Sequence, residues 1–130
     1  MEVNGREIGF RRSVLANCEL EKAAPDGDVR RLLNENLASS NYATAQEAAA
    51  AIIISLNKGH EMQKASADPA YKPHPLTMLE VMSLTEPEFN SLFDEAYQVF
   101  RNDGKITVEV AEDEKKTEKP VKKAAARKSN

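Results

Sequence analysis

Apolar residues recur at helical spacing most clearly between Phe89 and Phe100. The stripe consists of Phe89, Leu92, Phe93, Ala96, Tyr97 and Phe100. Such spacing is typical of one buried face of a helix. Thr85 and Glu88 have the spacing of a capping box at its start, and Leu84 with Phe89 forms the matching hydrophobic staple. Asp103–Gly104 is a typical stop, so we predict a helix over 86–102.

The first ten residues alternate around a strong turn signal. Asn4–Gly5 separates two short arms that carry apolar residues. Asn-Gly in this context favours a tight two-residue hairpin turn, so we predict a β-hairpin over Met1–Phe10. The residues expected on its buried face are Val3, Ile8 and Phe10.

Two shorter helices are predicted next, each with a capping residue at its start. Ser13 would cap a helix from Val14 to about Ala24, which Pro25–Gly27 would end. Its expected inner positions are Leu15, Cys18 and Leu20. Asp28 would cap the second helix, Val29–Ala38. Its expected inner positions are Val29, Leu32, Leu33 and Leu37.

A longer helix is predicted from the capping box Thr44–Glu47, and we expect it to be the central packing helix. Its inner stripe is Ala45, Ala48, Ala49, Ile52, Ile53 and Leu56. The small residues in this stripe would let another helix approach closely. Gly59 is expected to fray or bend the helix, which Met62 would extend.

The second half of the chain begins with a loop, Asp68–Pro75, that three prolines make stiff. A short helix over Thr77–Ser83 should then turn Met78, Leu79 and Met82 inward. Beyond Gly104, residues 106–110 alternate and are β-branched, which fits a third strand joined to the hairpin. We therefore predict a mainly α (α+β) fold: a bundle of four to five helices with a small N-terminal hairpin, forming one domain over 1–110.

Composition adds limits to this fold. Hydrophobic residues make up 41% of the chain but aromatic residues only 5%, so the core must be built mainly from aliphatic side chains. No apolar run reaches the roughly 18 residues of a membrane span, and the N-terminus lacks the pattern of a secretory signal. The single cysteine, Cys18, excludes an intramolecular disulfide and fits a reducing cytoplasm.

Charge is distributed unevenly along the chain. Residues 111–130 carry seven Lys or Arg and four Asp or Glu, a net charge of +3. Because the whole chain has a net charge of −3, residues 1–110 carry a net charge of −6. This tail lacks large apolar residues apart from Val121 and is expected to be disordered. Nucleic-acid binding through the tail is the weaker interpretation, because acids interrupt it and aromatic residues are missing.

No pattern of catalytic or metal-binding residues is present. Asp103–Gly104 resembles the centre of an EF-hand loop, but that register puts Val99 and Val110 where calcium needs carboxylates. His60 and His74 lack further ligands at metal-site spacing, and Cys18 is expected to be a buried structural thiol. We expect no enzyme, no catalytic residue, no metal and no cofactor.

The order of several short segments resembles that of the tail assembly chaperones of long-tailed bacteriophages and prophages. The segments are Val3–Ile8, Arg11–Arg12, Pro75–Thr77, Leu84–Phe89 and Thr107–Glu109, followed by the Lys-rich residues 111–130. The resemblance implies a helical protein that binds the tape measure protein in the host cytoplasm. Such a chaperone keeps the long helices of that protein soluble until tail tube subunits displace it.

A binder of apolar helices needs apolar surface of its own. The residues that we expect to supply it are Ile52, Ile53, Leu56, Met62, Met78 and Met82. Methionine adapts well to irregular partners, although each of these side chains taken singly also fits an ordinary core. The alternatives are a small cytoplasmic adaptor for another protein and, less favoured, a nucleic-acid accessory protein; a homo-oligomer is compatible with all of them.

Overall fold

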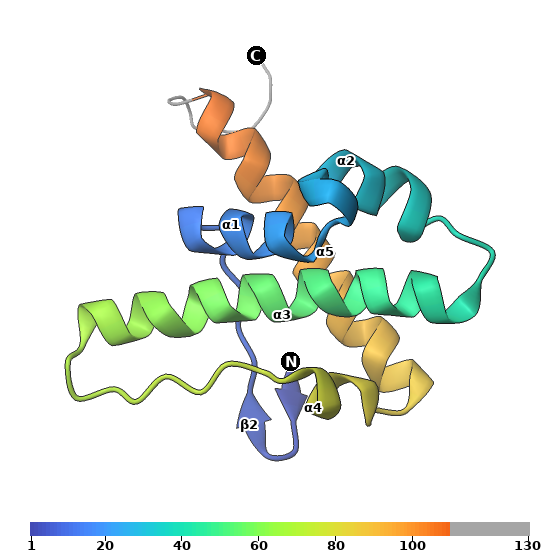
Figure 1. The fold of residues 1–130 in the computed structure, drawn as a ribbon. Helices are drawn as coiled ribbons and strands as arrows, with labels where there is room; N and C mark the ends of the chain where they lie inside the picture. The colour runs from blue at the N-terminus through green and yellow to red at the C-terminus, as the bar shows by residue number, and fades with distance from the viewer. Residues whose placement is uncertain (110–130) are drawn as a thin grey trace, which may run out of the picture. The chain divides into compact units, whose positions relative to one another are not determined.

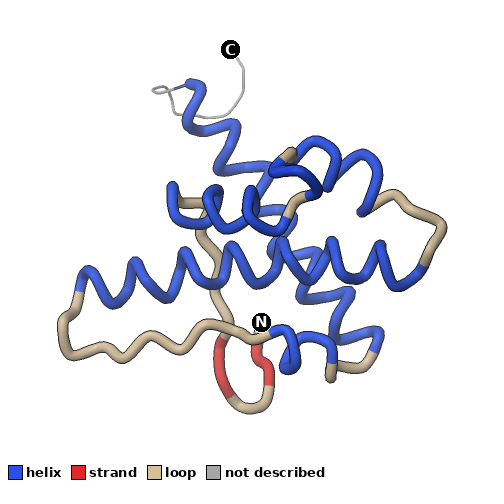
Figure 2. Tube along the Cα trace, viewed as in Figure 1, coloured by secondary structure: helices blue, strands red, loops and turns tan. Residues whose placement is uncertain are grey.

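The computed structural model describes residues 1–109. The chain divides into two compact units, Met1–Phe100 and a second that begins at Arg101. The first unit is mainly helical with a small N-terminal sheet (Figures 1 and 2), so the predicted fold class is confirmed. Residues 101–109 of the second unit are helical, and the predicted disordered tail over 111–130 lies outside the described residues.

The N-terminal sheet is the predicted hairpin, with very short strands. Strands β1 (Glu2–Val3) and β2 (Arg6–Glu7) pair antiparallel, with Val3 opposite Arg6. Asn4 and Gly5 both have positive φ, at 53° and 79°, as the tight turn requires. Val3 and Ile8 are buried in the core, as predicted.

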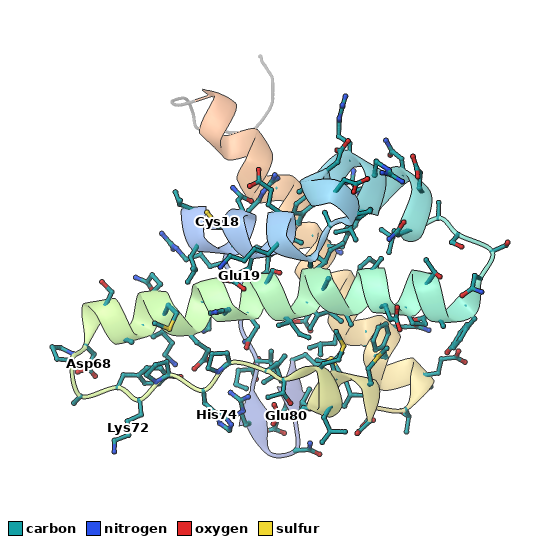
Figure 3. The ribbon with its side chains drawn as sticks, in the orientation of Figure 1. Cys18, Glu19, Asp68, Lys72, His74 and Glu80 are labelled. Atoms are coloured by element: carbon teal, nitrogen blue, oxygen red, sulfur yellow. The ribbon has the colours of Figure 1, made fainter. Side chains whose placement is uncertain are left out.

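Helix α1 (Val14–Ala23) begins where predicted, with the Ser13 hydroxyl accepting a hydrogen bond from the Ala16 amide. Its buried residues are Ala16 and Leu20. The prediction of Cys18 as a buried thiol is wrong, because the helix turns the Ala16–Leu20 face toward the core and leaves Cys18 exposed (Figure 3).

The next helical stretch is less regular than predicted. A single turn, η1 (Pro25–Gly27), follows α1, and Asp28 then caps α2 (Val29–Arg31). The chain continues as a wider π-helical turn, η2 (Leu32–Asn36), instead of one α-helix over 29–38. The predicted inner positions of this stretch nevertheless face the core, with Leu32 buried and Val29, Leu33 and Leu37 partly buried.

Helix α3 (Tyr42–Ala67) is the central helix. It begins earlier than predicted, because the Asn41 side chain, not Thr44, caps it by accepting from the Thr44 amide at 2.9 Å. It also runs unbroken past Gly59, which is buried inside the helix. In Figure 1, α1 lies on one side of α3 and α4 (Met78–Met82) on the other, while residues 86–100 cross behind it.

An extended segment, residues 68–77, connects α3 to α4, and we call it the strap. It runs alongside α3 (Figure 2). Two α3 side chains accept hydrogen bonds from its backbone. The Asn57 amide oxygen accepts from the Leu76 amide at 2.8 Å, and the Glu61 carboxylate accepts from the His74 amide at 2.9 Å. The strap therefore fixes where α4 begins.

Helix α5 (Glu86–Glu109) begins at the predicted capping box but is longer than predicted. The stop at Asp103–Gly104 and the strand over 106–110 are both wrong for the described residues, which are helical through Glu109. A glycine inside a helix costs only about 1 kcal/mol relative to alanine, so it does not end a helix by itself. The β-branched residues after it likewise disfavour a helix only slightly.

The core of the first unit gathers residues from the hairpin, the helices and the strap. The large side chains at its centre come from the N-terminal hairpin segment and from five helical elements, and they have almost no exposed surface. They include Ile8, Leu20, Leu32, Ile52, Ile53, Leu56, Val81 and Leu92. The α5 stripe completes this core with Phe89, Ala96 and Phe100, as predicted.

Candidate functional site

Helix α4 presents large apolar side chains to solvent. Met78, Leu79 and Met82 are 47%, 77% and 42% exposed, whereas Val81 is fully buried. The prediction that these three residues point inward is therefore wrong. In a helix of only five residues a single side chain is enough to anchor it, and here that residue is Val81.

Local hydrogen bonds fix α4 in place. Thr77 and Glu80 form a complete capping box, in which the Thr77 hydroxyl accepts from the Glu80 amide and the Glu80 carboxylate accepts from the Thr77 amide. At the other end, the Ser83 hydroxyl donates to the Leu79 carbonyl at 2.6 Å. Hydrogen bonding to the Thr77 amide lowers the pKa of Glu80, although partial burial opposes the shift.

A hollow of about 210 Å³ lies beside α4, between the starts of α3 and α5. Its lining residues are Tyr42, Gln46, Met82, Leu84, Glu86 and Phe89. The Tyr42 ring is 63% exposed, and its hydroxyl donates to the Glu86 carboxylate at 2.5 Å. This hydrogen bond raises the pKa of Tyr42. We call Met78, Leu79 and Met82 together with this hollow the α4 surface.

The predicted partner-binding residues are divided between core and surface. Ile52, Ile53 and Leu56 have no exposed area and pack inside the first unit. Met62 is 39% exposed on α3 but does not line the hollow. Of the predicted set, only Met78 and Met82 lie together on the α4 surface.

Sequence reasoning missed Tyr42 and Leu79 as surface residues. The predicted helix start at Thr44 leaves Tyr42 outside the central helix, although Asn41 is itself a good capping residue and brings Tyr42 into the first turn. Leu79 carried no such signal, since five residues are too few for periodicity to define an inner face.

A second cluster of polar side chains lies under the strap. Glu61 is 2% exposed and accepts hydrogen bonds from the Tyr71 hydroxyl and the His74 amide. Asn57 has no exposed area and also donates to the Gly9 carbonyl at 2.9 Å. Because each of these buried groups has its partners within the chain, the cluster serves to fasten the strap.

The cysteine and the two histidines, which were considered as candidate catalytic or metal-binding residues, do not form a common site. Cys18 lies on α1 and His74 on the strap, on opposite sides of α3 (Figure 3). Burial lowers the pKa of His60, whose ring fills the space next to Gly9. Within residues 1–109, no three His, Cys, Asp or Glu side chains are grouped closely enough to hold a metal ion.

Neither the hydropathy of the helices nor comparison with known proteins points to another functional feature. In the part of the chain that the structure describes, no helix is both long and apolar enough to cross a membrane. Comparisons of the chain with protein-family models, curated proteins and solved structures found no match. The α4 surface is therefore the feature on which a functional proposal can be built.

Proposed function

We propose that this protein is a non-catalytic assembly chaperone of a long-tailed phage, which binds the helices of the tape measure protein in the bacterial host cytoplasm. The observation that carries the proposal is the α4 surface. Three large apolar side chains stand exposed on one short helix, next to a hollow that Met82, Leu84 and Phe89 line together with polar residues. Grouped exposed apolar residues typically mark an interaction site for another protein.

The makeup of the α4 surface fits a partner with helices of varied sequence. Two of its three exposed side chains are methionines, which are unbranched and repack easily against different shapes. The rigid capping boxes hold the surface in place, so binding would require little ordering of the backbone. The helical fold with its N-terminal hairpin also agrees with what the resemblance to tail assembly chaperones implies.

Co-expression with the tape measure protein from the same genome tests this function. We expect the wild-type protein to keep that protein soluble and to form a complex with it. Leu79→Asp should abolish both effects, because it replaces the most exposed apolar side chain of the α4 surface with a charge. Val14→Asp is the matched control: Val14 is 81% exposed on α1, so it should behave as wild type.

Failure of the wild-type protein to rescue solubility would contradict the proposal. Rescue that Leu79→Asp leaves intact would place binding elsewhere on the molecule. Leu79-dependent binding to a different helical protein would instead favour the adaptor function.

A further inference from the structure

The segments that form the α4 surface carry an excess of negative charge, although Arg6 of β2 lies close enough to help lower the pKa of Glu80. Residues 73–100, which include α4 and the start of α5, contain five Asp or Glu and no Lys or Arg. Residues 36–57, which include the start of α3, contain Glu47 and again no Lys or Arg. Every segment that lines the hollow is therefore acidic or neutral.

Three of these carboxylates are held in fixed positions near the apolar residues. Glu86 lines the hollow itself and accepts from Tyr42. Glu80 and Glu88 each close a capping box at the start of α4 and α5. Hydrogen bonds from the Thr77 and Thr85 amides lower the pKa of Glu80 and Glu88, so both remain ionised at neutral pH.

The shape of the α4 surface suits a helix better than an extended chain. The exposed residues of α4 form a short ridge, and the hollow beside Met82 has room for a large apolar side chain. An amphipathic helix supplies such side chains at every third or fourth position along one face. In the strap, the backbone amides of His74 and Leu76 already donate to Glu61 and Asn57 of α3, so these amides are not available to pair with an added strand.

We infer that the α4 surface binds an amphipathic helix whose apolar face is flanked by lysine or arginine. This inference rests on the proposed function and specifies the chemistry of the partner. Basic flanks would face Glu80, Glu86 and Glu88, while the apolar face would cover the α4 ridge and fill the hollow. Such complementarity speeds association and rejects acidic helices.

Two other occupants fit less well. The α4 surface of a second copy would bring the same carboxylates face to face and repel them. The chain's own residues 111–130 are basic, but Val121 is their only large apolar residue, which is too few to cover the ridge.

Two designed peptides test the inference with the full-length protein. Both have about 18 residues and the same leucine positions on one helical face; one carries lysines beside the leucines and the other glutamates. We expect the lysine peptide to bind about tenfold more tightly at low salt, with the difference shrinking as salt is added. Leu79→Asp should abolish binding of the lysine peptide, and Glu86→Gln should reduce its advantage.

Glu35→Gln is the matched control, because Glu35 pairs with Arg31 away from the hollow and should not alter peptide binding. Equal affinity for both peptides, or binding that Leu79→Asp leaves unchanged, would overturn the inference. Tighter peptide binding by a variant with Lys122, Lys123, Arg127 and Lys128 changed to Gln would also overturn the inference. It would show that the chain's own tail occupies the α4 surface and competes with the peptide. Self-association that Leu79→Asp removes, without any peptide binding, would assign the surface to a second copy.

The two proposals can fail separately. Leu79-dependent rescue of the tape measure protein together with equal peptide affinities would leave the chaperone function standing and refute the basic partner. Selective binding of the lysine peptide without any rescue would support the surface chemistry and refute the chaperone function.

Discussion

Glu61 shows how one residue can organise a distant segment. Its buried carboxylate accepts from Tyr71 and His74, which lie 10 and 13 residues further along the chain. Burial alone would raise the pKa of Glu61, but these two hydrogen bonds and the positive charge of Arg6 outweigh it and lower the pKa. A carboxyl group whose pKa is lower in the folded state stabilises that state at pH values above its unfolded pKa.

We predict that Glu61→Gln lowers the free energy of unfolding at pH 7 by about 1–3 kcal/mol. The difference from wild type should shrink as the pH falls below about 4.3, because the wild-type carboxyl then loses its charge as well. Urea unfolding across pH 3–7 measures this. A difference that stays constant over that range would contradict the assigned role.

Hydrogen exchange adds a readout specific to the strap. In Glu61→Gln the His74 amide should lose protection, while the Leu76 amide, which Asn57 holds, should keep it. Glu35→Gln is the control, since an exposed pair with Arg31 contributes little to stability.

Side chains that cap a nearby helix end could be predicted from the sequence, but side chains that bond to distant backbone groups could not. Ser13, Asp28 and Thr85 bond to backbone two or three residues away, so short sequence patterns reveal them. Asn57 instead bonds to Leu76 and Gly9, which lie 19 and 48 residues away. Nothing in the sequence around Asn57 distinguishes it from an ordinary helical asparagine.

At the scale of elements, α3 and the segment before α1 pass very close to each other. The Arg11 amide donates to the Leu56 carbonyl at 2.9 Å, so this segment lies directly on the helix. A Cβ atom at Gly59 would come within 2.5 Å of the Arg11 carbonyl oxygen and 2.8 Å of the Ser13 hydroxyl. Gly59 is thus required by packing, although it lies in the middle of a helix.

We predict that Gly59→Ala destabilises the protein by about 1–3 kcal/mol through overpacking. This is opposite in sign to the gain of about 1 kcal/mol that alanine normally brings over glycine inside a helix. Thermal unfolding monitored by circular dichroism measures the change. Ser66→Ala, at an exposed position of α3, is the control and should be neutral or slightly stabilising; a stabilised Gly59→Ala would show that the segment can move aside.

Errors in predicting the elements came from packing that local patterns do not encode. The Asp103–Gly104 signal is compatible with a helix end, but the residues that follow continue the helix to Glu109. The apolar residues of α4 were assumed to point inward, because burial is the usual fate of Met and Leu. Their exposure depends on which face of α4 the strap and α3 leave uncovered.

At the scale of the whole first unit, Arg12 links the chain before α1 to α5. Its guanidinium donates to the Phe100 carbonyl at 2.8 Å and to the Asn17 side chain at 3.0 Å. It also lies 4.0 Å from the centroid of the Phe100 ring. Arginine is suited to this double contact, since its planar group can stack and donate at once.

We predict that Arg12→Ala lowers the free energy of unfolding by about 1–3 kcal/mol, and that Arg12→Lys recovers only part of this loss. Circular dichroism and tyrosine fluorescence should report the same urea midpoint, as expected if the elements of the first unit unfold together. Arg30→Ala is the control, because the Arg30 side chain is 87% exposed. A wild-type midpoint for Arg12→Ala would show that this link adds nothing.

The fold class could be predicted because it follows from the summed patterns of many residues. The hairpin turn, three of the helix caps and the α5 stripe each pointed to the same architecture, and small errors at element ends did not change it. The α4 surface could not be predicted in the same way. It consists of residues whose apolar character suits a core as well as an interface, and only the assembled fold separates Ile52 and Ile53 from Met78 and Leu79.

The exposure of Cys18 has a practical consequence. It is the only cysteine in the chain, and it stands on α1, on the side of α3 opposite α4 (Figure 3). A maleimide dye would therefore attach at one defined position without any engineered residue. Fluorescence from that dye would report complex formation at the α4 surface while leaving the surface itself unmodified.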